Sequence, residues 1–137
     1  MQALLLDTCA AIWIAEDEKL APAALDVLSN IYEAGLPTYV SPITAWEIGM
    51  LASRDRIKLL TTPQRWFLRL LDMPTVQLAD ISPDVLIASS FLPGKPPRDP
   101  TDRIIAATAR DYGCTLMTRD RALLDYGEQG HIRVLAC

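Results

Sequence analysis

Histidine and cysteine are scarce in this chain, and their scarcity excludes several kinds of site. The 137 residues include one histidine and three cysteines, and no two cysteines have C-x-x-C spacing. We therefore expect free thiols in a reducing cytoplasm, rather than a disulfide framework or a zinc site, at Cys9, Cys114 and Cys137. His131 lies near the C-terminus, so a histidine-based catalytic dyad or a histidine-activated cysteine nucleophile has no support.

Long apolar runs, repeats and glycine-rich phosphate loops are also missing. No apolar run approaches the roughly 20 residues of a membrane span, and no basic segment of the kind that opens a signal peptide occurs at the N-terminus. Neither G-x-G-x-x-G nor a Walker A motif is found, so nucleotide-cofactor binding has no support. We therefore expect a cytoplasmic protein without a membrane segment. Residues 1–137 should form a single domain, because half of them are hydrophobic and can supply a core.

Positive charge is sparse in the first part of the chain and concentrated later. The net charge is −4, which by itself disfavours a nucleic-acid partner. Residues 1–53 hold one Lys against seven acids, whereas residues 54–121 hold eleven Lys and Arg against eight acids. The uneven distribution, together with a bound divalent cation that would offset the acids, permits binding to a polyanion without requiring it.

Short apolar segments alternate with segments of helical periodicity. Strands are expected at residues 3–7, 38–40, 76–78, 115–118 and 132–134. Helices are expected up to about residue 15, from Pro22 to Gly35, from Pro42 and Pro63 onward, over 83–91 and 100–113, and after Asp120, with prolines at several helix starts. This alternation predicts an α/β fold, a three-layer α/β/α sandwich with a mainly parallel central sheet.

Four acidic residues stand where the apolar pattern ends or would be expected to continue. Asp7 follows the first apolar run, Asp120 follows residues 115–118, Asp102 lies at the start of a helix, and Glu47 lies within an apolar helix. In parallel sheets ligands bind beyond the carboxyl ends of the strands, where Asp7 and Asp120 are predicted to lie. Carboxylates gathered there would suit a hard cation such as Mg²⁺ or Mn²⁺.

Each acid also has a structural explanation. Asp7 and Asp120 can act as helix N-caps, and Asp99-Pro100-Thr101-Asp102 has the residues of a well-formed helix start. Glu47 is harder to explain in this way, because its helix neighbours are apolar and a buried carboxylate needs a partner. A salt bridge to an arginine would satisfy it, and so would a metal ion. Capping explains three acids separately, whereas one cation site explains all four.

Four segments of the chain, in order, match the motifs of a known family. They are Leu4-Leu5-Leu6-Asp7-Thr8, Ser41-Pro42-Ile43-Thr44-Ala45-Trp46-Glu47-Ile48, Arg98 to Ala109, and Leu116-Met117-Thr118-Arg119-Asp120. The chain resembles PIN-domain ribonucleases of the VapC-like toxin type over essentially its full length. Any one motif is weak, but all four in the correct order are fairly specific. Arg98 stands where related toxins often have His, and Thr101 stands where they often have an aromatic residue.

The resemblance implies a metal-dependent endoribonuclease, the toxin of a toxin–antitoxin pair. It implies that Asp7, Glu47, Asp102 and Asp120 are catalytic and bind Mg²⁺, or Mn²⁺ in its place, with Asp99 as an additional metal-binding acid and Thr118 as a nearby hydroxyl. It also implies an RNA substrate, a VapB-like antitoxin and a homodimer. Because three arginines adjoin the acids in sequence, they are candidates for substrate contact: Arg98, Arg103 and Arg119.

Two other classes of function remain open. A Mg²⁺-dependent phosphatase or phosphotransfer domain would use an aspartyl phosphate, but Asp7-Thr8-Cys9 lacks the second Asp of Asp-x-Asp, and Arg119 stands where a receiver domain has Lys. A catalytically silent PIN-like interaction module would use the acids only as caps.

A partner-binding groove is a further expectation. Its apolar wall would be formed by Ile12 and Trp13 on the first helix with Trp46 and Met50 on the helix that carries Glu47. The alternative is that both tryptophans fill the core.

Overall fold

Within residues 2–137, which this computed structural model describes, five strands form one parallel sheet. The strand order is β3-β2-β1-β4-β5, so the first strand lies at the centre. The strands are β1 (Leu4–Leu6), β2 (Thr38–Val40), β3 (Val76–Leu78), β4 (Thr115–Thr118) and β5 (Arg133–Ala136). Because every pair is parallel, all five carboxyl ends meet at one edge of the sheet.

The helices connect the strands and begin mostly at prolines or capping side chains. They are α1 (Thr8–Ala15), α2 (Pro22–Glu33), α3 (Pro42–Ser53), α4 (Pro63–Leu71), α5 (Pro83–Ala88), α6 (Pro100–Tyr112) and α7 (Arg121–Glu128). The predicted cap at Ser41 is confirmed, because its hydroxyl accepts from the Ile43 N–H at 3.1 Å. Asp99 caps α6 in the same way, and Gly113 ends that helix in the left-handed conformation.

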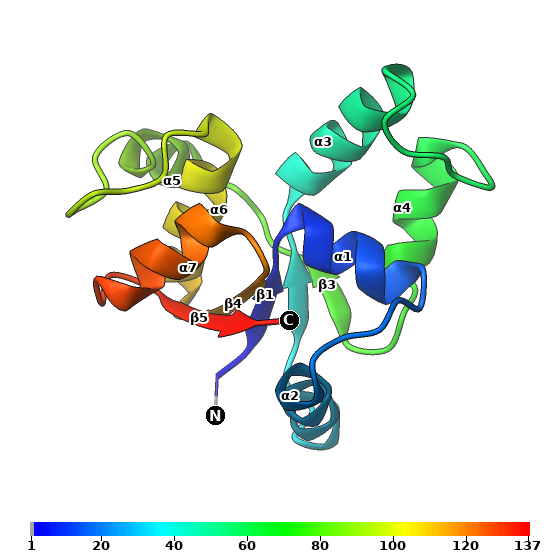
Figure 1. The fold of residues 1–137 in the computed structure, drawn as a ribbon, viewed down its shortest axis with the longest axis horizontal. Helices are drawn as coiled ribbons and strands as arrows, with labels where there is room; N and C mark the ends of the chain where they lie inside the picture. The colour runs from blue at the N-terminus through cyan, green and yellow to red at the C-terminus, as the bar shows by residue number, and fades with distance from the viewer. Residues whose placement is uncertain (1) are drawn as a thin grey trace.

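Helices cover both faces of the sheet (Figure 1), and an apolar cluster lies between each set of helices and the sheet. Leu4 and Leu6 pack with helices α1 to α4, whereas Leu5, between them, packs with α6 and α7. This division follows from the alternation of side chains along a strand. All three leucines are fully buried, as expected for a central strand covered on both sides. The predicted three-layer α/β/α architecture is therefore confirmed.

Three predicted elements have different limits in the structure. Helix α5 ends at Ala88 rather than near Phe91, because Ser89 is its C-cap and donates its hydroxyl to the Leu86 carbonyl at 2.6 Å. The first strand begins and ends one residue inside its predicted limits, because Asp7 already caps α1. The last strand runs to Ala136 because its pairing with β4 continues to Thr118, a tertiary contact that an apolar pattern does not reveal. No helix of the described residues has the length and apolarity needed to cross a membrane.

Two helical glycines provide a matched test of how tightly α7 packs on β5. A Cβ at Gly127 would lie 2.3 Å from Cγ2 of Val134, so Gly127→Ala should lower the free energy of unfolding by about 1–3 kcal/mol. A Cβ at Gly49 in α3 would meet nothing within 4 Å. Gly49→Ala should therefore raise stability by up to about 1 kcal/mol. Urea unfolding followed by circular dichroism measures both, and equal effects of the two substitutions would contradict the close packing of α7.

Candidate active site

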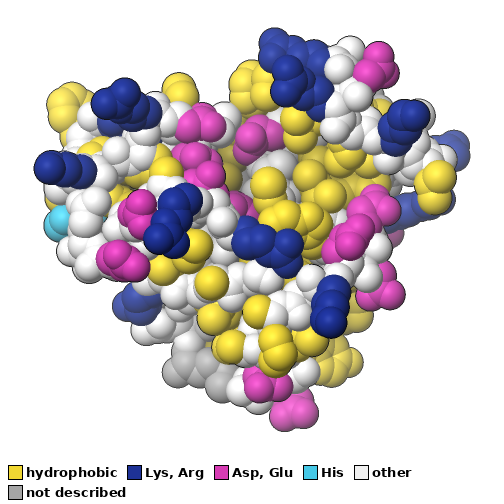
Figure 2. Space-filling view, in the orientation of Figure 1, with side chains coloured by type: hydrophobic (Ala, Val, Ile, Leu, Met, Phe, Trp, Pro, Cys, Tyr) yellow, Lys and Arg dark blue, Asp and Glu magenta, His cyan; other side chains and the backbone are white. Residues whose placement is uncertain are grey.

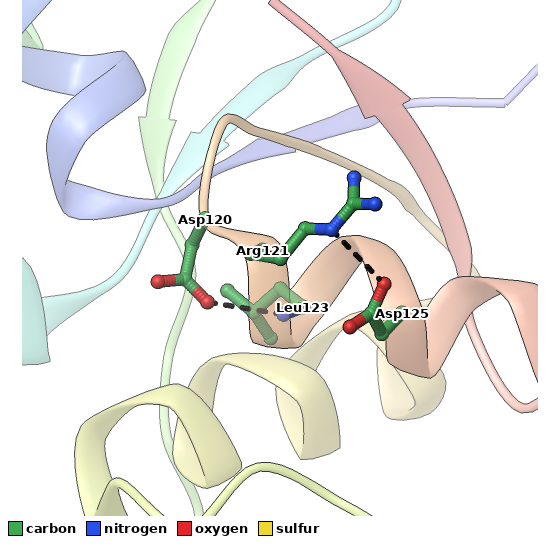
Figure 3. Close-up of polar contacts among 4 residues, drawn as sticks. All are labelled: Asp120, Arg121, Leu123 and Asp125. Atoms are coloured by element: carbon green, nitrogen blue, oxygen red, sulfur yellow. Dashed lines mark hydrogen bonds and ion pairs between the residues drawn. The ribbon is translucent and has the colours of Figure 1, made fainter.

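Acidic side chains from four elements gather around the carboxyl edge of the sheet. Asp7 directly follows β1, and its carboxylate accepts from the Ala10 N–H of α1 at 2.8 Å. Asp120 follows β4 and accepts from the Leu123 N–H of α7 at 3.0 Å (Figure 3). Asp102 lies in the first turn of α6, and Glu47 lies in the middle of α3. The predicted helix caps at Asp7 and Asp120 are thus present.

A capping role leaves most of these carboxylates with an oxygen to spare. Asp120 uses only Oδ2 for its cap, and Asp99 uses only Oδ1, which accepts from both the N–H and the hydroxyl of Thr101 at 2.9 Å. Within the described residues, Asp102 has no hydrogen-bond donor at all. Capping and ligand binding are therefore compatible at Asp99 and Asp120, because the cap occupies one carboxylate oxygen and the other accepts no hydrogen bond from the described residues.

Buried hydroxyl groups hold two of the acids in place. The Thr118 hydroxyl donates to Oδ2 of Asp7 and accepts from the Asp120 N–H at 3.0 Å, so it joins the ends of β1 and β4. The Thr8 hydroxyl donates to Oε1 of Glu47 at 2.5 Å and lies 3.2 Å from the hydroxyl of Thr44. Glu47 therefore has a threonine hydroxyl as partner, and of the two partners considered from the sequence, the arginine salt bridge is not formed among the described residues.

Burial and mutual repulsion raise the pKa of three of these carboxyl groups. Burial, followed by the charges of Asp120, Asp99, Glu47 and Asp7, raises the pKa of Asp102 to about 7. Burial also raises the pKa of Asp7 and of Glu47, although the hydroxyls of Thr118 and Thr8 oppose these increases. The five carboxylates therefore act on one another across a shared space, and protonation or a cation would relieve their repulsion.

Within residues 2–137, no basic side chain forms an ion pair with these carboxylates. The only ion pair in residues 2–137 joins Arg121 Nε to Asp125 Oδ1 at 3.4 Å, and both side chains are exposed on α7. Figure 3 shows the Arg121 guanidinium extending toward Asp125 and away from the neighbouring Asp120. The negative charge at the edge of the sheet is thus left for a ligand to neutralise.

The donor set fits a hard divalent cation in its chemistry. Carboxylate oxygens are the ligands that Mg²⁺ and Mn²⁺ prefer, and the residues that could supply them are Asp7, Glu47, Asp99, Asp102 and Asp120. Within residues 2–137, however, no three Asp, Glu, His or Cys side chains are gathered tightly enough to hold an ion. Water ligands would have to complete the coordination, or the side chains would have to move inward. Mg²⁺ commonly keeps several waters and uses only one or two carboxylates.

The three arginines proposed from the sequence as substrate contacts differ in their surroundings. Arg103 donates through Nε to the Pro97 carbonyl at 2.7 Å. The Arg119 guanidinium lies 3.6 Å from the ring centroid of Trp13 and donates to the Cys137 carbonyl at 2.8 Å. These two side chains already tie parts of the fold together. Arg98 is exposed beside Asp99 and has no hydrogen-bond or ion-pair partner among the described residues.

Sequence reasoning missed Thr8 and Thr44 as contributors to the site. Thr8 follows Asp7 directly, and Thr44 precedes Glu47 by three residues and so lies on the same side of α3. These two sequence positions, next to Asp7 and on the Glu47 side of α3, were the available evidence that the threonines belong to the site. Their contact across 36 residues of sequence could be recognised only in the folded chain.

Comparisons with known proteins agree with the fold and with the sequence motifs. A profile of the PIN domain matches residues 4–129. Ribonuclease VapC22 of Mycobacterium tuberculosis is 35% identical over 124 residues, which cover 90% of this chain and 91% of that protein. VapBC2 from Rickettsia felis, solved with a promoter DNA fragment, aligns with a TM-score of 0.68 at 13% identity and covers 98% of both chains. DNA-bound VapBC from Salmonella typhimurium aligns with a TM-score of 0.63 at 19% identity and covers 99% of this chain and 98% of that one. At these identities the two structures show a shared fold.

Removing one site carboxylate should stabilise the metal-free protein. The pKa of Asp102 is about 7 in the folded chain against an ordinary 3.8, so the folded state holds the proton more tightly. Stability is therefore lost as the pH rises between these values. With EDTA at pH 8, we expect Asp102→Asn to gain about 1 kcal/mol, or ~2–6 °C in Tm, after allowance for solvent screening of a half-exposed group.

The gain from Asp102→Asn should vanish near pH 4, where the wild-type carboxyl is protonated in the folded protein. Asp26→Asn, at an exposed position of α2, is the matched control and should gain nothing at pH 8. Differential scanning calorimetry at the two pH values measures the effect. A destabilised Asp102→Asn at pH 8 would show that the carboxylate is compensated within the chain.

Proposed function

The chain belongs to the PIN domain family, and we propose that it is a metal-dependent endoribonuclease that hydrolyses RNA phosphodiester bonds. The observation that carries this proposal is the set of mutually repelling carboxylates at the sheet edge, none of which forms an ion pair within the described chain. Without a bound cation, such a site would repel a polyanion such as RNA. A bound Mg²⁺ or Mn²⁺ would neutralise it, activate a water and stabilise the leaving oxygen.

The side chains near the site favour attack by water over attack by a protein nucleophile. Burial, followed by the charges of Asp7, Glu47, Asp120 and Asp102, raises the pKa of the Cys9 thiol to about 11, so it remains protonated. His131 precedes β5 and therefore lies toward the opposite edge of the sheet. Neither group is placed to act as a nucleophile, so the carboxylates are the groups left to position and activate a water.

The burial of Asp7 argues against an aspartyl-phosphate mechanism. Asp7 is only 4% exposed, and both of its oxygens accept hydrogen bonds, from the Ala10 N–H and the Thr118 hydroxyl. A carboxylate held in this way is poorly placed to attack phosphorus. It is better suited to hold a cation at a fixed point, with Asp102 and Asp120 as the other proposed ligands and with Glu47 and Asp99 acting directly or through water.

The catalytically silent alternative explains Asp102 only as an acid in the first turn of α6. Asp7, Asp99 and Asp120 each cap a helix, but Asp102 caps none and is repelled by its neighbours. A site that lowers stability in this way is typical of a functional constraint. This cost favours the enzyme over the interaction module.

We also propose a VapB-like antitoxin as partner, supported by an exposed apolar surface beside the site. Trp46 is 56% exposed, which contradicts the alternative that it fills the core. Trp13 is half-buried beneath Arg119. An apolar hollow of about 400 Å³ lies between α3 and α4, next to the turn of α3 that bears Trp46. It is lined by Ala45, Gly49, Pro63, Gln64, Phe67 and Leu68.

A homodimer is proposed on a different surface. Leu86 and Ile87 of α5 and Phe91 just after it are exposed by 45%, 62% and 81%, respectively. Three large apolar side chains within six residues are typical of a surface that becomes covered on association.

Two carboxylates of the site should respond differently to loss of charge. Asp7→Asn retains the shape and most of the capping ability of Asp7, yet we expect RNA cleavage with Mg²⁺ to fall at least about 100-fold because a metal ligand loses its charge. Asp99→Asn should lose less than about tenfold, since capping is its better-supported role. Single-turnover cleavage of a labelled RNA measures both, with circular dichroism to confirm folding. Wild-type cleavage by Asp7→Asn would refute a catalytic Asp7.

The antitoxin proposal predicts a stable complex on co-expression with the small reading frame beside the gene. The complex should copurify and show suppressed nuclease activity, and Trp46→Ala should weaken it by about tenfold or more, because an exposed Trp is a frequent anchor at interfaces. Leu60→Ala, at a residue exposed on the connection after α3, is the control. An active nuclease that is harmless when expressed alone and captures no such partner would contradict the proposal.

A further inference from the structure

Three basic side chains extend from the end of α3 and its following turn. Arg54 is the C-cap of the helix, and Arg56 and Lys58 follow it, all three exposed. We call residues 54–58 the basic turn; with Asp55 included it carries a net charge of +2. The only ion pair of residues 2–137 lies on α7, so no carboxylate of the described chain pairs with these side chains. Figure 2 shows Lys and Arg gathered over the free end of α3.

The backbone of the basic turn is firmly fixed. The Asp55 N–H bonds to the Ala52 carbonyl at 3.2 Å and the Arg56 N–H to the Leu51 carbonyl at 2.9 Å. This pair of bonds is a Schellman motif, with Asp55 in the left-handed position at φ 54°. Further along, Ile57 and Leu59 pack against the core while Lys58 between them points outward. The three basic side chains therefore extend from a backbone of defined conformation.

The first residue of the basic turn, Arg54, lies on the same face of α3 as Glu47. Arg54 follows Glu47 by seven residues, which is two helical turns, so the two side chains share one face of α3 about 10 Å apart along its axis. Glu47 is close enough to Asp99 and Asp7 for their charges to raise its pKa. Figure 2 shows a hollow whose wall bears Asp and Glu, with Lys and Arg at the end of α3 beside it. Helix α3 thus carries negative charge at the site and positive charge on its rim.

We propose that the basic turn binds the phosphate backbone of the RNA strand whose scissile bond lies in the acidic site. This inference rests on the proposed ribonuclease function. Phosphates beyond the scissile bond need positive groups outside the acidic cluster, and release of their counterions favours binding to Arg and Lys. Arg54 and Arg56 are the principal contacts, because guanidinium groups bind phosphate oxygens through two parallel N–H bonds. At this distance from Glu47 they contact neighbouring phosphates, so they affect strand binding and not the chemical step.

The experiment compares two double variants that each remove two positive charges. Arg54→Ala/Arg56→Ala alters the basic turn, whereas Lys19→Ala/Arg69→Ala alters exposed positions after α1 and on α4. Fluorescence anisotropy with a labelled single-stranded RNA, with Ca²⁺ in place of Mg²⁺ to neutralise the acidic site, measures the affinity at several salt concentrations. For Arg54→Ala/Arg56→Ala we expect Kd to rise about tenfold and the slope of log K against log salt to fall by about 1.4, or 0.7 for each phosphate contact. The Lys19→Ala/Arg69→Ala control should change neither.

Cleavage with Mg²⁺ supplies a second readout. In Arg54→Ala/Arg56→Ala, KM should rise about tenfold while kcat stays within about twofold. This pattern is expected when the lost contacts bind the substrate and the transition state equally. Wild-type RNA affinity and salt slope in this variant, or an equal loss in the control, would overturn the proposal while leaving the nuclease intact. Loss of antitoxin binding with RNA affinity retained would assign the turn to a protein partner and also overturn it. A wild-type chain that neither binds nor cleaves RNA would refute the proposed function itself.

Discussion

The parallel pairing of β1 with β4 is the constraint on which the site depends. Its register places Leu6 beside Met117, so the next residues of both strands, Asp7 and Thr118, emerge side by side at the carboxyl edge. There the Thr118 hydroxyl donates to Asp7 and accepts from the Asp120 backbone. A shift of one residue in either strand would turn its side chains to the opposite face and separate these groups. The packing of Leu4, Leu5 and Leu6 in the two cores opposes such a shift.

The same edge concentrates charge that the fold does not neutralise. Helix N-termini and hydroxyl groups offset part of the cost, because Asp7, Asp99 and Asp120 each cap a helix and Thr8 donates to Glu47. Asp102 lies in the first turn of α6 but accepts no hydrogen bond from the described residues, and its pKa of about 7 reflects burial among like charges. Near neutral pH the metal-free protein therefore gives up stability at this edge, a loss that a bound cation would reverse. The same carboxylates that would bind the catalytic cation therefore lower the stability of the metal-free protein.

Much of the fold follows from local signals, which is why it could be predicted. Five helices begin with proline at the first or second position, and the central strand is a continuous apolar run. The placement of Asp7 and Asp120 followed from the general rule that parallel strands end together. By contrast, the Thr8–Glu47 hydrogen bond joins α1 to α3, and no local pattern specifies it. The exposure of Trp46 could not be predicted either, because the sequence pattern of a helix is the same whether its apolar residue faces the core or a partner.

The central claim is that the carboxylates at the edge of the sheet hold one or more divalent cations. A crystal of the protein soaked with Mn²⁺, measured for anomalous scattering at the manganese absorption edge, tests it most directly. We predict an anomalous peak within coordination distance, about 2.2 Å, of oxygens from Asp7 and from at least one of Asp102 and Asp120. In an Asp102→Asn crystal the peak should weaken or disappear. A clear manganese peak elsewhere on the molecule, with none among these carboxylates at millimolar Mn²⁺, would contradict the account.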